Sequence, residues 1–200
     1  MELLLTLSRR IDAMSDYISK KVMWLVLVLT LVSTFNALMR YTINYSSNAW
    51  LEVQWYLFSA VFMLMAGYTL LKNAHIRIDV LASHLPHKVQ AWIDVVCFFL
   101  FLTPMVLGIL WLALPLVQES FLRNEYSPSP GGLLRWPVKA LLPLGLLLLF
   151  IQGLSELIKK LAFLSGHLPD PYATDEGPSA EEKLAAEIKA QLAAKQGAAA

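Results

Sequence analysis

The sequence predicts an all-α integral membrane protein with four transmembrane helices, and three observations support this fold class. The chain has 200 residues, of which 57% are hydrophobic and only 16% are charged, whereas soluble domains contain about 45–50% apolar and about 25% charged residues. The apolar residues collect in long runs with few charges. The lysines and arginines are distributed unevenly between the segments that join these runs.

Four runs approach or exceed the length that crosses a bilayer. A hydrocarbon core of about 30 Å requires about 20 helical residues at 1.5 Å each. Each run is apolar around nearly its whole helix, which suits lipid or bundle burial and not a surface helix. The predicted spans are 22–38, 50–71, 89–117 and 137–164.

These spans divide the chain into three parts. A cytoplasmic N-terminal segment, 1–21, precedes a transmembrane domain, 22–165, and a cytoplasmic tail, 166–200, follows it. Pro and Gly residues early in the tail end the fourth helix. After them, Ser179 and Glu182 resemble a capping box, and apolar residues recur at helical spacing. We therefore expect an amphipathic C-terminal helix in a tail that is partly helical or disordered.

The orientation in the membrane follows from the basic residues. With both termini in the cytoplasm, twelve lysines and arginines lie on the cytoplasmic side and four lie outside, as the positive-inside rule requires. Tryptophans near the span ends support the predicted boundaries, because amphipathic rings prefer the membrane interface. These tryptophans are Trp24, Trp50, Trp55, Trp92 and Trp136.

The chain lacks the sequence patterns of an enzyme or a nucleic-acid-binding protein. No Gly-rich phosphate loop, His-Glu-x-x-His or Gly-x-Ser-x-Gly motif occurs, and a net charge of +1 does not favour nucleic acid. The single cysteine, Cys97, excludes an intrachain disulfide and a Cys-based metal cluster. His84 and His87 with Asp79 are interpreted as a solvated loop, not a metal site. We expect no catalytic residues, no bound cofactor and no metal.

The deep parts of the spans contain almost no ionisable groups, so the chain is not expected to transport an ion-coupled substrate alone. Two other classes stay open. A self-sufficient homo-oligomeric transporter would have to use Glu52, Asp94 or Glu156, and each lies near a span end. A membrane anchor of a redox complex would need intramembrane histidines for haem, and all four histidines lie outside the spans.

One stretch, from Arg40 to Pro86, is more specific than the rest. In order and spacing it resembles the DctQ family, the small membrane subunit of tripartite ATP-independent periplasmic (TRAP) transporters, and the resemblance covers roughly 15–165. The chain departs from the family pattern at Val53, Gln54 and Trp55, where many members carry acidic and basic residues. The matching elements are Arg40-Tyr41-x-x-Asn44, Trp50-x-Glu52 and His75-Ile76-Arg77-Ile78-Asp79-Val80.

The resemblance implies a role in uptake across the bacterial inner membrane. In such systems a periplasmic substrate-binding protein captures an organic acid, and a large TRAP membrane subunit moves it by a sodium-driven motion. The small subunit is then a fixed scaffold that holds the large subunit in the lipid bilayer. Sodium is expected to bind the large partner subunit and not this chain.

The candidate scaffold and interface residues come from the same stretch. Arg40 and Glu52 lie at opposite ends of one short loop, so they either pair with each other or contact a partner or lipid headgroups. Asn44 is expected to close that loop by side-chain bonds to the backbone. The alternation of polar and apolar residues around Arg77 predicts a structural junction on the cytoplasmic side. The full set is Arg40, Asn44, Trp50, Glu52, Gln54, Trp55, His75, Arg77 and Asp79.

Overall fold

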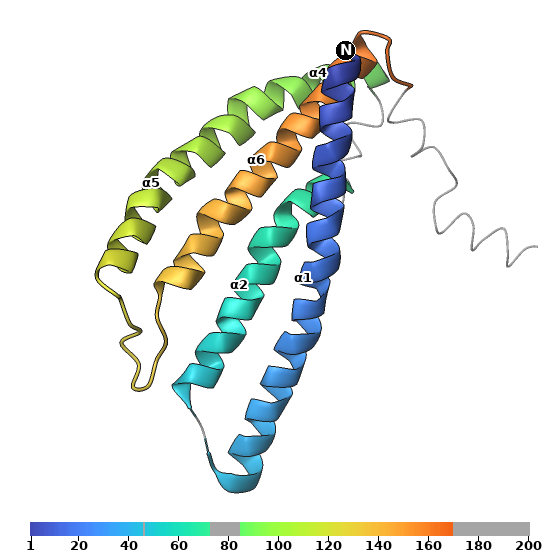
Figure 1. The fold of residues 1–200 in the computed structure, drawn as a ribbon. Coiled ribbons are helices and arrows are strands. Elements are labelled where there is room, and N and C mark those ends of the chain that lie inside the picture. The colour runs from blue at the N-terminus through green and yellow to red at the C-terminus, as the bar shows by residue number, and fades with distance from the viewer. Residues whose placement is uncertain (46, 73–84, 170–200) are drawn as a thin grey trace, which may run out of the picture.

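The structure, a computed structural model, describes residues 1–45, 47–72 and 85–169 and consists of long helices joined by loops (Figure 1). Four helices are long and apolar enough to cross a membrane, which confirms the predicted all-α class with four candidate spans. The predicted tail helix lies outside the described residues, as do His75, Arg77 and Asp79. The elements are α1 (Glu2–Ile43), α2 (Asn48–Leu71), α4 (His87–Cys97), the π-helix η1 (Phe98–Leu102), α5 (Thr103–Leu122) and α6 (Trp136–Leu164).

Two of the predicted spans match the helix ends closely, and the first does not. The helices α2 and α6 begin one or two residues before the expected spans and end where these end. In contrast, α1 continues far beyond 22–38 on both sides and includes nearly all of the segment 1–21. No proline or glycine occurs before Asn44, so no backbone signal stops the helix where its side chains become polar. At 1.5 Å per residue, α1 is about 63 Å long, roughly twice the hydrocarbon thickness.

Asn44 ends α1 through its backbone. It adopts the left-handed conformation, with φ 52° and ψ 26°, which asparagine tolerates better than most residues. The N–H groups of Asn44 and Tyr45 both donate to the carbonyl of Met39. The expected bonds from the Asn44 side chain to the backbone are not seen among the described residues. The structure therefore assigns the turn to the backbone preference of asparagine.

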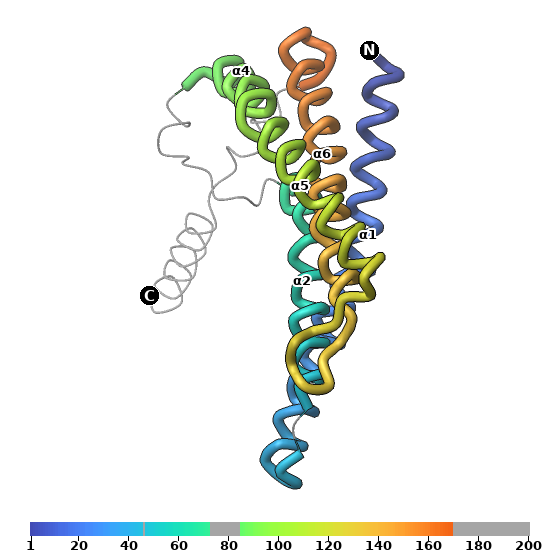
Figure 2. Tube along the Cα trace, turned by 90° about the vertical axis from the view of Figure 1, so that its left-hand side faces the viewer, coloured from blue at the N-terminus to red at the C-terminus, as the bar shows by residue number. Residues whose placement is uncertain are grey.

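The third long helix changes its hydrogen-bonding pattern where a proline follows. Pro104 has no N–H, and its ring would clash with the carbonyl one turn earlier in a regular α-helix. Over η1 the backbone widens to a π-helix, and both the N–H and the Oγ1 of Thr103 donate to the carbonyl of Phe98, the Oγ1 at 2.9 Å. The helix is thus continuous from α4 to α5 but bent at the bulge (Figure 2).

α6 is the central helix of the bundle. It packs against α1, α2, α4 and α5, while α1 and α2 also pack against each other. Glycine permits the closest contact, because a Cβ at Gly145 would lie 2.5 Å from the carbonyl oxygen of Met63 on α2. A Cβ at Gly67 would lie 3.2 Å from the carbonyl oxygen of Leu148. Small residues at these crossings let the two backbones approach, as is usual between membrane helices.

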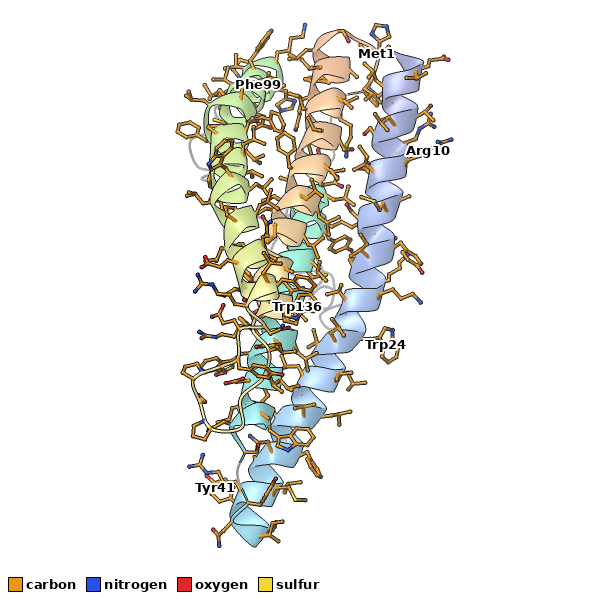
Figure 3. The ribbon with its side chains drawn as sticks, turned by 60° about the vertical axis from the view of Figure 1, so that its left-hand side comes forward. Met1, Arg10, Trp24, Tyr41, Phe99 and Trp136 are labelled. Carbon is orange, nitrogen blue, oxygen red and sulfur yellow. The ribbon has the colours of Figure 1, made fainter. Side chains whose placement is uncertain are left out.

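The connections define two ends of the bundle. The α1–α2 and α5–α6 loops lie at one end, called the loop end here, and Met1, α4 and the end of α6 lie at the other, the N-terminal end (Figure 1). Figure 3 shows Met1 and Tyr41 at opposite ends of α1, with the ring of Trp24 pointing away from the bundle. Trp24 is 66% exposed, which is the environment expected for a residue that faces lipid.

Candidate functional site

Two polar sites hold the helices together, one at each end of the bundle. At the loop end, three residues of α2 bind the loop 123–135. Asn48, Glu52 and Tyr56 are spaced four residues apart, so they lie on one face of the helix. We call these three residues and their backbone partners the loop clamp.

The loop clamp acts through hydrogen bonds to the loop backbone. The Glu52 carboxylate accepts from the N–H of Leu133 at 2.7 Å. The Tyr56 hydroxyl donates to the carbonyl of Leu134 at 2.7 Å, and the Asn48 amide donates to the carbonyl of Pro130 at 3.1 Å. These bonds join residues about 80 positions apart in the chain, so they fix the α5–α6 loop on the start of α2.

Two glycines and a β-bridge shape the loop 123–135. Gly131 has φ +73°, and a Cβ at Gly132 would lie 2.4 Å from the Cβ of Ser127 and 2.9 Å from a Glu52 oxygen. An antiparallel bridge joins Tyr126 to Leu134. The loop 123–135 is thus folded back on itself and seated on α2.

Glu125 ties the same loop to the start of α6. Its carboxylate forms ion pairs with Lys139 and with Arg135, the latter at 3.6 Å. The Lys139 ammonium, with a smaller contribution from Arg135, holds the pKa of Glu125 below its ordinary value. The carboxylate therefore stays charged as the pH falls through the usual glutamate pKa, and the ion pairs persist.

At the N-terminal end, polar side chains of α1 and α6 form a buried polar network. Gln152 is fully buried, accepts from Ser15 at 2.6 Å and donates to Asp12 at 2.8 Å. Ser155, also fully buried, donates to Asp12 at 2.7 Å and lies 2.7 Å from the hydroxyl of Ser8. The network therefore joins α1 and α6 by hydrogen bonds, and none of its described side chains has a buried polar atom without a partner.

A lysine completes the network. Lys159 forms ion pairs with Asp12 at 3.0 Å and with Glu156 at 2.5 Å. The next residue, Lys160, pairs with Asp94 of α4 at 3.3 Å. The polar network thus continues through α6 to the third helix, and the charges near this end of α6 are held by protein partners.

The sequence carries a signal for the polar network within the segment 1–21, which the hydropathy pattern alone does not reveal. Ser8, Asp12, Ser15 and Ser19 recur at intervals of three and four residues, and all but Asp12 are buried. Such spacing places them on one face of a helix. The prediction of 1–21 as a segment before the transmembrane domain does not include its packing against α6, which the structure shows.

The candidate interface residues near the first loop differ in their contacts. Glu52 binds the loop backbone, and no ion pair joins it to Arg40, which is exposed at the loop end of α1. The ring of Trp50 packs on Phe35 of α1 with centroids 5.7 Å apart. In contrast, Trp55 is 74% exposed. A contact of Arg40 or Trp55 with a partner or lipid stays a prediction.

Within the described ranges, no group of three or more His, Cys, Asp or Glu residues is arranged to hold a metal ion. A family model described as "Tripartite ATP-independent periplasmic transporters, DctQ component" matches residues 10–163. The chain belongs to the DctQ family. It is therefore a multi-pass membrane component of a TRAP transporter, a family without enzymatic activity. Comparisons with curated proteins and with solved structures gave no match.

For this DctQ-family chain, the loop clamp leads to a direct prediction. In the Glu52→Ala variant, the amide of Leu133 loses its acceptor, and we expect it to exchange hydrogen about tenfold faster or more. Hydrogen–deuterium exchange of the full chain in lipid nanodiscs measures this rate. Glu119→Ala is the matched control, because Glu119 forms only an exposed i,i+4 pair with Arg123. Unchanged protection of Leu133 in Glu52→Ala would show that the clamp does not hold the loop.

Proposed function

We propose that this chain is the fixed scaffold subunit of a TRAP transporter. It holds the large membrane subunit in the bacterial inner membrane during sodium-coupled, binding-protein-dependent uptake of an organic acid. The observation that carries this proposal is the family match over residues 10–163. The sodium and substrate sites belong to the large subunit, and the periplasmic binding protein delivers the substrate.

The internal pairing of charges supports a scaffold role. Transport proteins usually place ionisable groups where they face a pathway through the membrane. Here Glu52 binds the loop backbone, Glu156 pairs with Lys159, and Asp94 pairs with Lys160. The three acidic residues that a self-sufficient transporter would use are thus each bonded to other groups of this chain.

The α1–α2 face is the proposed contact for the large subunit. Thr30, Ser33 and Thr34 are exposed along α1, and with Gln54 and Trp55 of α2 they line a shallow groove. The Nε2 of Gln54 is buried and has no hydrogen-bond partner within the described part of the chain. The Thr30 hydroxyl donates to the carbonyl of Val26 in its own helix. The hydroxyls of Ser33 and Thr34 and the Gln54 amide are more favourable in this surface when a neighbouring helix supplies hydrogen-bond partners.

The outer face of α5 differs from this groove. Its exposed side chains in the span are large and apolar, including Leu107, Trp111 and Leu112. Such a surface is as compatible with lipid tails as with protein. We therefore place the large subunit against α1 and α2 and the lipid against α5.

The proposed orientation puts both termini in the cytoplasm. The loop end then faces the periplasm, and the loop 123–135 lies on the side from which the binding protein approaches. Arg40 is exposed at this end, where it reaches a partner or lipid headgroups. The positive-inside distribution of lysine and arginine supports this orientation.

Co-purification tests the contact face. We expect Trp55→Ala to reduce recovery of the large subunit on the tagged small subunit about tenfold, since exposed tryptophans are typical energetic centres of interfaces. Trp111→Ala is the matched control, because Trp111 is 80% exposed on α5 and should have no effect. A loss confined to Trp111→Ala would place the interface on α5 instead. Uptake by the small subunit alone in liposomes would overturn the scaffold proposal itself.

A further inference from the structure

A cleft lies beside the π-helix, between the third helix and α6. It encloses about 380 Å³, and its walls are mostly apolar, formed by Phe98, Leu102 and Met105 on one side and Leu149 and Leu157 on the other. The ring of Phe98 lies over Gly153, where a Cβ would come within 2.8 Å of it. The cleft is therefore part of the folded bundle and is partly open to the surroundings.

One end of the cleft is charged. Asp94, Glu156 and Lys160 line it together with the apolar residues. Their ion pairs connect them to Lys159 and Asp12, so among the described residues three carboxylates face two ammonium groups in this cluster. The cluster thus carries a net negative charge, and the Asp94 side chain is 37% exposed. A positively charged group is favoured at this end of the cleft.

The two ends of the cleft lie at different depths along α6. About 20 helical residues cross the hydrocarbon core, so a span that starts at Pro137 ends near Glu156. Leu149 lies within the uncharged part of α6, whereas Lys160 lies in the last turns of the predicted span 137–164, beyond the part that crosses the hydrocarbon core. The charged end is therefore at the membrane interface and the apolar end is inside the hydrocarbon. A phospholipid in the adjacent leaflet has the same arrangement, with its charged headgroup at the interface and its acyl chains in the hydrocarbon.

The cleft is too small to enclose a transmembrane helix. A helix with side chains is about 10–12 Å across, so about 380 Å³ would hold only a few ångströms of its length. A single acyl chain is narrow enough to enter. We propose that this cleft binds a zwitterionic phospholipid with a primary ammonium headgroup. One acyl chain lies against Phe98 and Leu149, and the ammonium group lies against Asp94 and Glu156.

Lipid competition tests this site, which does not depend on the scaffold role. The full chain is reconstituted in nanodiscs of phosphatidylethanolamine, phosphatidylcholine and phosphatidylglycerol in equal parts, and native mass spectrometry counts the lipids retained. We expect one phosphatidylethanolamine per chain, retained about fivefold over the other two lipids. The choline headgroup has no N–H to donate, and the glycerol headgroup leaves the lipid anionic. Met105→Trp should abolish this retention by filling the cleft, while Leu112→Trp, an exposed position of α5 outside the cleft, should not.

The single cysteine gives a second readout that needs no substitution in the cleft. Cys97 lines the cleft and is exposed, so a bound lipid should slow its alkylation by N-ethylmaleimide about threefold in phosphatidylethanolamine nanodiscs relative to phosphatidylcholine nanodiscs. Equal retention of all three lipids, or retention that survives Met105→Trp, would overturn the proposal. Cross-linking of Cys97 to a neighbouring protein in native membranes would assign the cleft to a protein partner and overturn it as well.

Discussion

Replacing Gly145 with alanine is expected to force α2 away from α6 and to lower the free energy of unfolding by about 3 kcal/mol. The added Cβ would lie 2.5 Å from the carbonyl oxygen of Met63 and 2.7 Å from its Cβ. These atoms belong to the backbone or are fixed to it, so no side-chain rotation relieves the clash. Unfolding in mixed micelles by titration with SDS, followed by tryptophan fluorescence, measures the change.

Gly108→Ala is the control for this prediction. Nothing lies within 4 Å of the Cβ position at Gly108 on α5, so alanine there should be neutral or gain up to about 1 kcal/mol from its higher helix propensity. Both substitutions add one methyl group to a membrane helix, and only the packing differs. Equal stability of the two variants would mean that α2 and α6 do not pack this closely in the bilayer.

The Gln152→Leu variant should lose about 2–3 kcal/mol of stability, because it removes the amide at the centre of the polar network. Gln152 is fully buried, accepts from Ser15, and donates to Asp12. Leucine has a similar volume, so the loss reports unpaired polar groups and not a cavity. The same titration with SDS measures it, and Gln118→Leu, at an exposed position of α5, is the control.

A double-mutant cycle identifies the source of that loss. If Ser15 stabilises the bundle through Gln152, then Ser15→Ala should cost less in the Gln152→Leu background than in the unmodified chain. Additive effects of the two substitutions would contradict the hydrogen bond between them. The cycle also separates the network from general destabilisation of α6, which would affect both backgrounds equally.

The loop clamp and the polar network explain why α6 is the centre of the bundle. The network fixes one end of α6 to α1, and the clamp with Glu125 fixes the loop that leads into its other end. Between them, Gly145 brings α6 against α2. A scaffold subunit requires such internal fixation, because its helices have to keep their positions while a partner moves.

The fold class, the four candidate spans and the family follow from the sequence alone. Hydropathy and motif spacing are properties of short stretches, so they can be read without knowing which helices meet. The motif spacing also singles out residues such as Trp50 and Glu52, but it does not predict their contacts. The extent of α1 was underestimated, since hydropathy marks where a helix enters lipid and not where its backbone ends.

The pairing of the polar groups, in contrast, becomes visible in the folded bundle and not in the sequence. Ser15 and Gln152 are 137 positions apart, and Glu52 and Leu133 are 81 apart. Whether such groups meet depends on the register and closest approach of the helices, which Gly145 and the bend at η1 set. The same geometry creates the cleft between Phe98 and Leu149. These features arise from the relative placement of distant helices, and no local pattern in the sequence specifies that placement.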